Sequence, residues 1–239
     1  MKKVQCFLLM LIPFSLSAQD SANTTNKGWA IGLIVSPDYC YRAITSDGSV
    51  SMDNIVSSRN KNETAQSGIT SGINLCYFFK KRFSIETGIN YSNRGYRTKY
   101  FSDFISPVPN PFIPTRINYI YNYNFIDIPL KINFIAGRKK MRFIASAGIN
   151  TNFLLFFKEA QIAEYADGRT LISYPKPETG FNFSDLSVSL SAGTDINLTN
   201  KLNLRIEPIY RYGLGIKQTS PIKEHLWNAG LNFGFYFRF

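Results

Sequence analysis

Residues 227–239 read WNAGLNFGFYFRF, and this stretch decides the fold class. Side chains of a β-strand alternate between its two faces. One face of such a strand would carry Trp, Ala, Leu and four Phe, and the other would carry Asn, Gly, Tyr and Arg. An exposed apolar stripe of this size would aggregate in water. The pattern therefore predicts a strand with one face toward lipid and the other, made mostly of small polar residues, toward a protein interior.

The first 18 residues have the pattern of a secretory signal peptide. Lys2 and Lys3 form a basic start, residues 7–16 are largely apolar, and small residues at Ser17 and Ala18 precede Gln19. We expect residues 19–239 to form one domain. No later stretch reaches the ~18 apolar residues of a membrane helix. A barrel strand crosses with about 10 alternating residues, so the mean hydropathy of -0.12 does not argue against a membrane location.

Seven further runs alternate like the C-terminal one, and no helical period competes with them. The eight predicted strands are 28–43, 68–79, 83–99, 116–136, 141–158, 185–198, 202–217 and 227–239. We expect bulges at Pro129 and Pro208, because proline cannot donate to the ladder. The polar faces are rich in Gly, Ser and Asn, which suit the narrow interior of a membrane barrel better than the exterior of a soluble one. The sequence predicts an all-β, eight-stranded antiparallel up-and-down transmembrane β-barrel.

Short and long connections alternate along the chain. Three are short (80–82, 137–140 and 199–201), three are long (44–67, 100–115 and 159–184), and a link of medium length lies near 218–224. Outer-membrane barrels combine short periplasmic turns with longer extracellular loops, so we expect both termini on the periplasmic side of the outer membrane. The short turns are basic, which suits lipid headgroups but is also ordinary in soluble turns. Near the outer interface we expect a girdle that includes Tyr119, Tyr121 and Tyr123.

Several charged residues fall on the inward faces. Charges away from bulk water must pair or become neutral, and acids and bases are mixed here, so we expect a salt-bridged network that fills the lumen. A polar pathway for ions or small solutes is the alternative. The network comprises Glu86, Arg94, Asp127, Lys131, Asp195, Glu207, Arg211 and Arg238, with Arg142 and Arg205 joining it.

Other chemistry is sparse. His225 is the single histidine, so a hydrolase would have to use it, with Ser184, Asp185 or Ser220 nearby; we expect no enzyme. Neither a metal-ligand cluster nor a phosphate loop is present, so we expect no cofactor and no metal. Cys40 and Cys76 either pair or stay as free thiols. The formal net charge of +11 arises partly from the basic turns, and we expect no nucleic-acid partner.

One motif resembles a known family. The run Phe125-Ile126-Asp127-Ile128-Pro129-Leu130 is similar to the signature in the middle strand of PorT-like outer-membrane β-barrels, within the porin family. The runs 88–92 (GINYS) and 147–150 (AGIN) resemble that family's strand pattern. The aromatic residues Phe235, Phe237 and Phe239 resemble the insertion signal that the barrel-assembly machinery reads. The resemblance implies an outer-membrane barrel and, as for a few members, a part in protein secretion.

The leading functional expectation is a non-enzymatic scaffold in the outer membrane, with a plugged lumen and extracellular loops that bind partners. Its expected partners are outer-membrane lipid, the barrel-assembly machinery during insertion, and a protein bound by the loops. Three alternatives stay open: an accessory subunit of a protein secretion apparatus, a narrow channel for small solutes, and a lipid-modifying enzyme acting at the rim.

Overall fold

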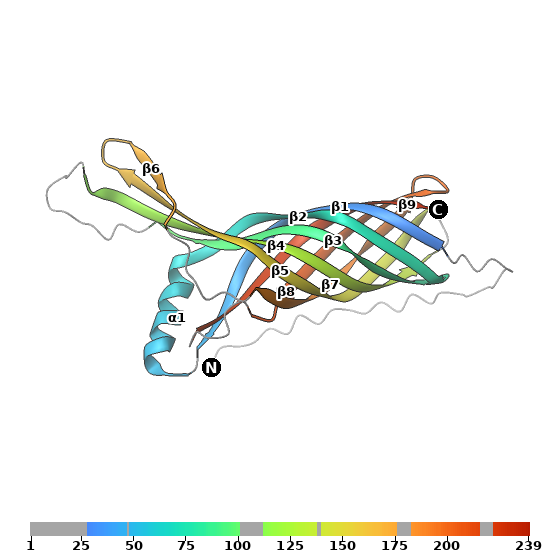
Figure 1. The fold of residues 1–239 in the computed structure, drawn as a ribbon, viewed down its shortest axis with the longest axis horizontal. Coiled ribbons are helices and arrows are strands. Elements are labelled where there is room, and N and C mark those ends of the chain that lie inside the picture. Colours follow the sequence, from blue (N-terminus) through green and yellow to red (C-terminus); the bar gives the residue numbers. More distant parts are fainter. Residues whose placement is uncertain (1–27, 47, 101–111, 138–139, 176–182, 216–221) are drawn as a thin grey trace, which may run out of the picture.

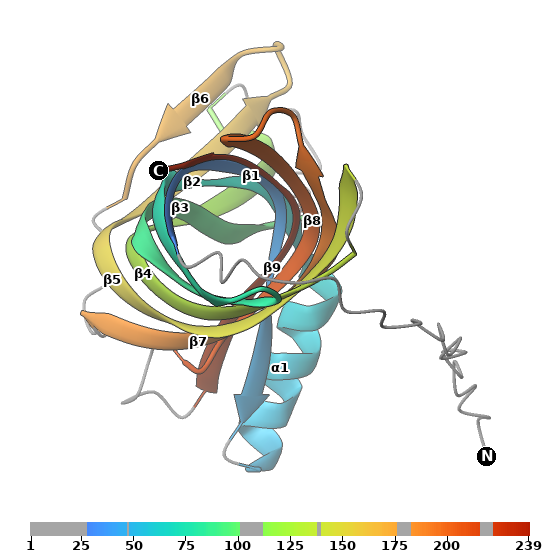
Figure 2. The same ribbon diagram turned by 90° about the vertical axis from the view of Figure 1, so that its right-hand side faces the viewer.

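The computed structural model describes residues 28–46, 48–100, 112–137, 140–175, 183–215 and 222–239. Its strands and single helix are β1 Gly28–Ser46, α1 Val50–Asn62, β2 Glu63–Lys80, β3 Phe83–Thr98, β4 Pro114–Ala136, β5 Met141–Tyr165, β6 Thr170–Ser173, β7 Ser184–Asn197, β8 Leu202–Gly213 and β9 Ile222–Arg238. All strands except β6 form one antiparallel ring, closed where β1 meets β9 (Figures 1 and 2). The predicted all-β fold and ring of eight strands are confirmed.

The predicted alternation holds around the ring. In β9, Asn228 and Asn232 are buried on the inside, whereas Leu231 and Phe235 are exposed on the outside. The same alternation runs along β7, where serines face inward and Leu186, Val188 and Leu190 face outward. An eight-stranded ring leaves an interior only wide enough for side chains, and small polar residues therefore line it.

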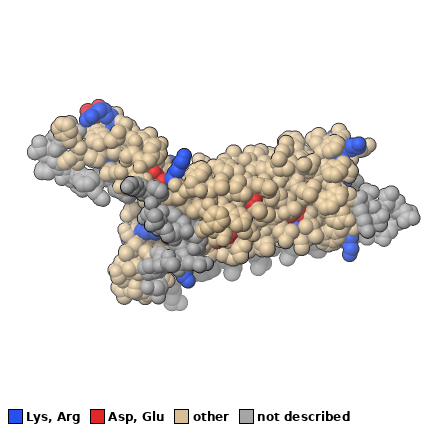
Figure 3. All heavy atoms as spheres, in the orientation of Figure 1, with Lys and Arg blue, Asp and Glu red and all other residues tan. Residues whose placement is uncertain are grey.

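The two ends of the barrel differ. The turn end carries the connections β2–β3, β4–β5 and β7–β8, together with the C-terminal residue Phe239 (Figure 1). The loop end carries α1 and the projecting parts of β4, β5 and β6. On the face shown in Figure 3, Lys and Arg lie mainly near the two ends, and the surface between them consists mostly of other residues with a few small patches of Asp and Glu.

A belt without outward charge lies between these ends. From the turn end up to the level of Arg97, Lys158 and Lys223, the outward faces of the described strands carry no Asp, Glu, Lys or Arg. Exposed Ile, Leu, Val and Phe side chains cover the belt instead. Such an apolar band of about 25 Å is what a transmembrane barrel presents to lipid.

Aromatic side chains border the belt on both sides. Near the turn end, the Trp29 and Tyr77 rings lie 4.6 Å apart between centroids, and the Phe83 and Phe134 rings 5.3 Å apart. Toward the loop end, Trp227 is surrounded by aromatic rings with centroids 5.9 to 6.2 Å away, those of Tyr39, Tyr41 and Tyr210. Aromatic residues favour the interface between lipid and water, so these two sets mark the borders of the belt.

The loop end departs from the predicted pattern in several places. The long connection 44–67 contains the helix α1, and β2 begins at Glu63 rather than at residue 68. None of the residues of α1 is buried. Its sequence therefore has no apolar stripe from which a helix could be predicted. The connection 159–184 contains β6, which pairs with β5 at Gln161–Glu164, beyond the ring. No helix among the described residues is long and apolar enough to cross a membrane.

Two expectations about β4 and β8 are wrong. The register is unchanged across Pro129, which lies opposite Asn150, and across Pro208, which lies opposite Leu231. The bulges lie elsewhere, for example between Ala65 and Ile69 of β2. The expected girdle position of Tyr123 is also wrong, because its side chain is buried inside the barrel. Tyr119 and Tyr121 are only half-buried, and their rings stack on each other.

Candidate functional site: the lumen and its loop end

The first polar cluster lies inside the barrel near the turn end and is centred on Glu86 of β3. Lys131 Nζ lies 2.6 Å from its carboxylate and Arg205 Nη1 lies 2.8 Å from it. The Tyr236 hydroxyl donates to the same carboxylate at 3.1 Å, and the Arg205 guanidinium sits 3.9 Å from the centre of the Tyr236 ring. All four side chains are buried. This level of the lumen is thus crossed by bonded side chains from β3, β4, β8 and β9.

Asp195 of β7 extends this cluster. It forms an ion pair with Arg142 of β5, and its carboxylate lies 3.7 Å from Nε of Arg205. The Asn203 amide donates to it at 3.1 Å. Since Arg205 contacts both Glu86 and Asp195, the two acids share one guanidinium, which links opposite walls of the barrel.

A second polar level lies farther toward the loop end. Asp38 of β1 accepts hydrogen bonds from Ser36, Thr70 and Asn228 at 2.7, 2.6 and 2.7 Å. Arg211 Nη1 lies 3.3 Å from the same carboxylate. Arg94 and Asp127, both buried, form a separate ion pair between β3 and β4.

At the mouth of the lumen, side chains from α1 and from four strands bond to one another. Arg59 of α1 donates to Glu63 at 2.7 Å, to Glu224 at 2.8 Å and to the Tyr96 hydroxyl at 2.9 Å. Arg42 of β1 donates to Glu63 at 2.6 Å. Burial alone would lower the pKa of Arg59, but Tyr96, Glu63 and Glu224 together raise it above its ordinary value. The guanidinium therefore stays charged and ties α1 to the barrel.

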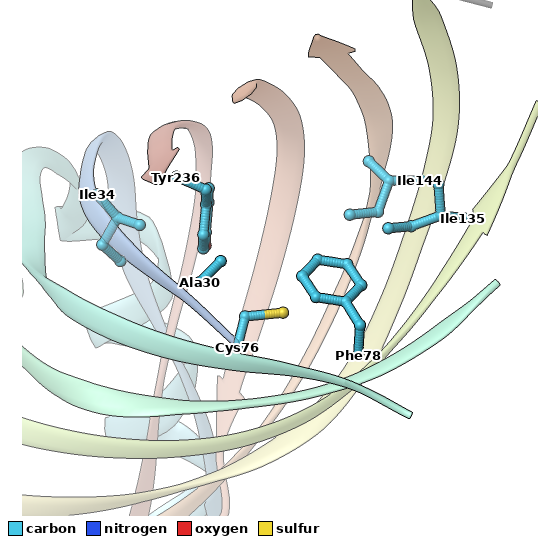
Figure 4. Packing of buried hydrophobic residues seen from close by; sticks show 7 residues of the cluster. All are labelled: Ala30, Ile34, Cys76, Phe78, Ile135, Ile144 and Tyr236. Atoms are coloured by element: carbon cyan, nitrogen blue, oxygen red, sulfur yellow. The ribbon is translucent and has the colours of Figure 1, made fainter. Parts of the chain in front are cut away.

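Apolar layers separate the polar ones. Near the turn end, seven side chains from five strands converge inside the barrel (Figure 4), namely those of Ala30, Ile34, Cys76, Phe78, Ile135, Ile144 and Tyr236. A second buried cluster lies near the mouth and contains Tyr96, Tyr123, Phe125 and Leu226. The described lumen is packed with side chains along much of its length, as expected for eight strands.

The structure places all eight charges of the expected network on inward faces, but it does not pair all of them. Glu207 accepts hydrogen bonds from the Ser146 and Ser191 hydroxyls at 3.2 and 2.9 Å. Arg238 is half-buried, with its guanidinium 4.1 Å from the centre of the Phe78 ring. Neither has an ion-pair partner among the described residues.

Several charged residues of the lumen were missed by sequence reasoning. Asp38 lies in the first predicted strand on the same face as Ser36 and Cys40, so alternation alone could have found it. Arg42 follows the same alternation. The other missed residues lie in connections that the sequence did not resolve, and they are Arg59, Glu63 and Glu224.

The cysteines and His225 have the following surroundings. Cys40 and Cys76 are buried, free thiols. The two thiols lie at different levels of the β1–β2 strand pair, because Cys40 is opposite Gln66 and Cys76 is opposite Ala30. The His225 Nδ1 lies 3.3 Å from the Gly213 carbonyl oxygen, and its ring stacks on that of Tyr212.

Among the described residues, Asp185 lies within electrostatic range of His225, but no hydrogen bond joins the two side chains. Asp185 accepts a hydrogen bond from the Gly215 backbone N–H at 3.0 Å, and Ser220 lies outside the described residues. The described residues contain no group of three or more His, Cys, Asp or Glu that could hold a metal ion.

The remaining sequence motifs lie on regular strand positions. In the run 125–130 of β4, Phe125, Asp127 and Pro129 face inward and alternate with outward Ile126, Ile128 and Leu130. The C-terminal Phe235, Phe237 and Phe239 are exposed on the outside at the turn end. Residues 1–27, with the expected signal peptide, and the basic turn residues Arg138 and Lys139 lie outside the described residues.

Comparison with known proteins agrees with this geometry. The family described as "Outer membrane protein beta-barrel domain" matches residues 17–239. No curated protein matches the chain. Solved structures that are similar to it include the Neisserial surface protein A, at 12% identity and TM-score 0.47, covering 89% of this chain and 97% of that one.

Two further similar structures are outer-membrane proteins of other bacteria. OprG from Pseudomonas aeruginosa has 12% identity and TM-score 0.43, covering 89% of this chain and 97% of that one. The attachment invasion locus protein Ail of Yersinia pestis has 12% identity and TM-score 0.35, and the match covers 87% of this chain and 99% of that one.

Proposed function

The chain belongs to the outer membrane protein beta-barrel domain family, and on that premise we propose that it is a non-enzymatic scaffold of the outer membrane. In this proposal the lumen is plugged and the loop end binds partners outside the cell. Both termini lie on the periplasmic side, and the barrel-assembly machinery inserts the chain. The partners are lipid around the belt and a protein at the loop end; no nucleic acid is involved.

The observation that carries the proposal is the contrast between lumen and loop end. The lumen is crossed by bonded side chains at the level of Glu86, at the level of Asp38 and at the mouth. The loop end instead offers exposed surface: α1 has no buried residue, and β6 pairs with the part of β5 that lies beyond the ring. In β6, Leu171 and Ile172 are both more than half exposed. Exposed apolar groups on a free sheet edge are typical of surfaces that bind another protein.

A photo-crosslinking experiment in the native membrane tests the binding role. A photoreactive residue is introduced at Ile172 on β6 and, as the matched control, at Leu198 beside the turn end; both are exposed apolar positions. We expect a discrete protein adduct from Ile172 and none of the same mass from Leu198. Adducts from Leu198 alone would contradict a binding role for the loop end.

A narrow channel is the second candidate, and one observation favours it. Buried polar atoms midway along the lumen have no hydrogen-bond partner among the described residues, including Asn90 Oδ1, Ser92 Oγ and Asn232 Oδ1. Such groups are commonly satisfied by water. Planar-bilayer recordings decide between the candidates: the scaffold proposal expects no steps in conductance, whereas discrete steps would establish a channel.

A further inference from the structure

Two depressions on the outer wall of the barrel meet at Ala229 and Gly230 of β9. One, of about 930 Å³, crosses β4, β5, β7 and β8, with Ala145, Ala192 and Pro208 in its lining. The other, of about 750 Å³, continues across β1 and β2 to Arg97 of β3. We call the two together the wall groove. It runs from within the apolar belt to the loop-end border of that belt.

The wall groove exists because small residues lie side by side on neighbouring strands. Ala145 of β5 faces Ala192 of β7 in the register. Ala229 lies between Tyr39 and Tyr210 on the two flanking strands, so it forms a low point between two aromatic rings. The surrounding belt carries large side chains, and the first depression is therefore a concave, mostly apolar path in the surface that faces lipid, while the second also has Gln66 and Ser67 in its lining.

The loop-end limit of the groove carries a positive charge without a counter-charge. Arg97 is exposed, and the structure gives its side chain no ion pair or hydrogen bond among the described residues. Asp38 also borders the groove, but its carboxylate is occupied inside the barrel by Ser36, Thr70 and Arg211. Arg97 is thus the charge that an occupant of the groove would meet.

We propose that the wall groove binds one membrane lipid with a phosphorylated, anionic headgroup. The phosphate pairs with Arg97, and an acyl chain follows the groove past Ala229 toward Pro208 and Ala192. A cation at the interface attracts anionic headgroups, and the apolar remainder of the groove matches a hydrocarbon chain. This inference rests on the membrane location of the barrel and is independent of the binding role proposed for the loop end.

Charge argues for a lipid over a second copy of this chain. In a two-fold dimer in the membrane, the same surface of both copies forms the contact. A contact through the wall groove would then bring two Arg97 side chains to the same level of one interface, where like charges repel. A lipid phosphate instead supplies the missing negative charge.

Native mass spectrometry of the full chain in detergent tests the headgroup. The probes are dioleoylphosphatidylglycerol, which is anionic, and dioleoylphosphatidylcholine, which has the same chains but no net charge. We expect one phosphatidylglycerol to bind more tightly than phosphatidylcholine. Arg97→Gln should weaken phosphatidylglycerol binding about fivefold and weaken phosphatidylcholine binding less, because the choline cation already offsets the charge of that phosphate. Lys223→Gln, which removes an exposed outward charge outside the groove, should change neither.

A second pair of variants tests the groove itself. Ala229→Phe fills its low point and should reduce the binding of both lipids, whereas Thr87→Phe enlarges an exposed outward position on β3 outside the groove and should not. Heat-dependent gel mobility checks that each variant is folded. Equal binding of both lipids, unaffected by Arg97→Gln, would overturn the proposal. So would an Ala229→Phe variant that changes only the oligomeric state, which would assign the groove to a second copy of the chain.

Discussion

At the scale of single residues, one buried acid holds much of the turn-end lumen together. Replacing Glu86 by Gln keeps its size but leaves Lys131 and Arg205 without their shared counter-charge. Breaking a buried ion pair from one side is strongly destabilising. We expect Glu86→Gln to lower the free energy of unfolding by about 3 kcal/mol. The urea midpoint at which the detergent-folded barrel loses its fast gel mobility measures this change.

A second substitution separates lost charge from lost packing at this site. Arg205 keeps Asp195 as a neighbour, whereas Lys131 loses its ion-pair partner. Lys131→Met removes that unpaired cation, so the double variant Glu86→Gln/Lys131→Met should be less destabilised than Glu86→Gln alone. Glu164→Gln, at a half-buried acid on the loop-end part of β5, serves as the control and should leave the urea midpoint unchanged. If Glu86→Gln behaves like this control, the Glu86 cluster does not hold the barrel together.

Single residues also show how far the alternation of side chains predicts which residues line the lumen. Asp127 and Lys131 were placed inward from the period of two alone, and both are buried inside. Tyr123 lies four residues before Asp127, so the same period required it to face inward; the expectation of an aromatic girdle there overrode a signal that was present. Which partner each charge would take was not predictable, because Arg205 and Glu86 are 119 residues apart and meet across the lumen.

At the scale of elements, α1 is held chiefly by side chains reaching out of it. Arg59 bonds to Glu63 and Glu224 while no residue of the helix is buried. Charge-assisted hydrogen bonds contribute about 1.5 kcal/mol each, so the loss of both in Arg59→Gln should speed amide hydrogen exchange in α1 on the order of a hundredfold. Lys61→Gln, in the same last turn, is the matched control. Equal exchange in wild type and Arg59→Gln would mean that other contacts anchor the helix.

The C-terminal strand β9 supplies a prediction about assembly. Its exposed outward phenylalanines end on Phe239, whose backbone N–H donates to the Trp29 carbonyl of β1 at 3.1 Å. Deleting Phe239 should reduce the amount of folded, heat-modifiable protein in the membrane, whereas deleting the side chain of Phe112 by Phe112→Ala, at an exposed loop-end position, should not. Normal insertion of the shortened chain would remove the assembly role of this residue.

Strands were predictable from the sequence and the loop-end elements were not, for one physical reason. A strand in the barrel wall has lipid on one side and the lumen on the other. Consecutive residues therefore alternate between apolar and polar side chains along the strand. The helix α1 has no buried residue, and all four residues of β6 are exposed. Nothing imposes two different faces on them, and no period reveals them.

At the scale of the whole molecule, the charge-free belt fixes how deeply the barrel sits in the membrane. Leu190 lies outward in the belt, and Leu198 lies eight residues farther along the chain, just past the end of β7 at the turn end. An arginine at the bilayer midplane costs about 2–4 kcal/mol in a transmembrane barrel, and one near the interface costs about 0–1 kcal/mol. Leu190→Arg should therefore destabilise the barrel by about 3 kcal/mol and Leu198→Arg by less than about 1 kcal/mol.

Denaturant titrations of both variants, folded into lipid vesicles, measure this difference. The two substitutions introduce the same side chain in place of the same residue, so only depth in the bilayer separates them. Repeating the pair in detergent micelles should shrink the difference, because a micelle adapts its thickness to an inserted charge more readily than a bilayer does. Equal costs in vesicles would mean that the belt between the aromatic borders is not the segment that spans the bilayer.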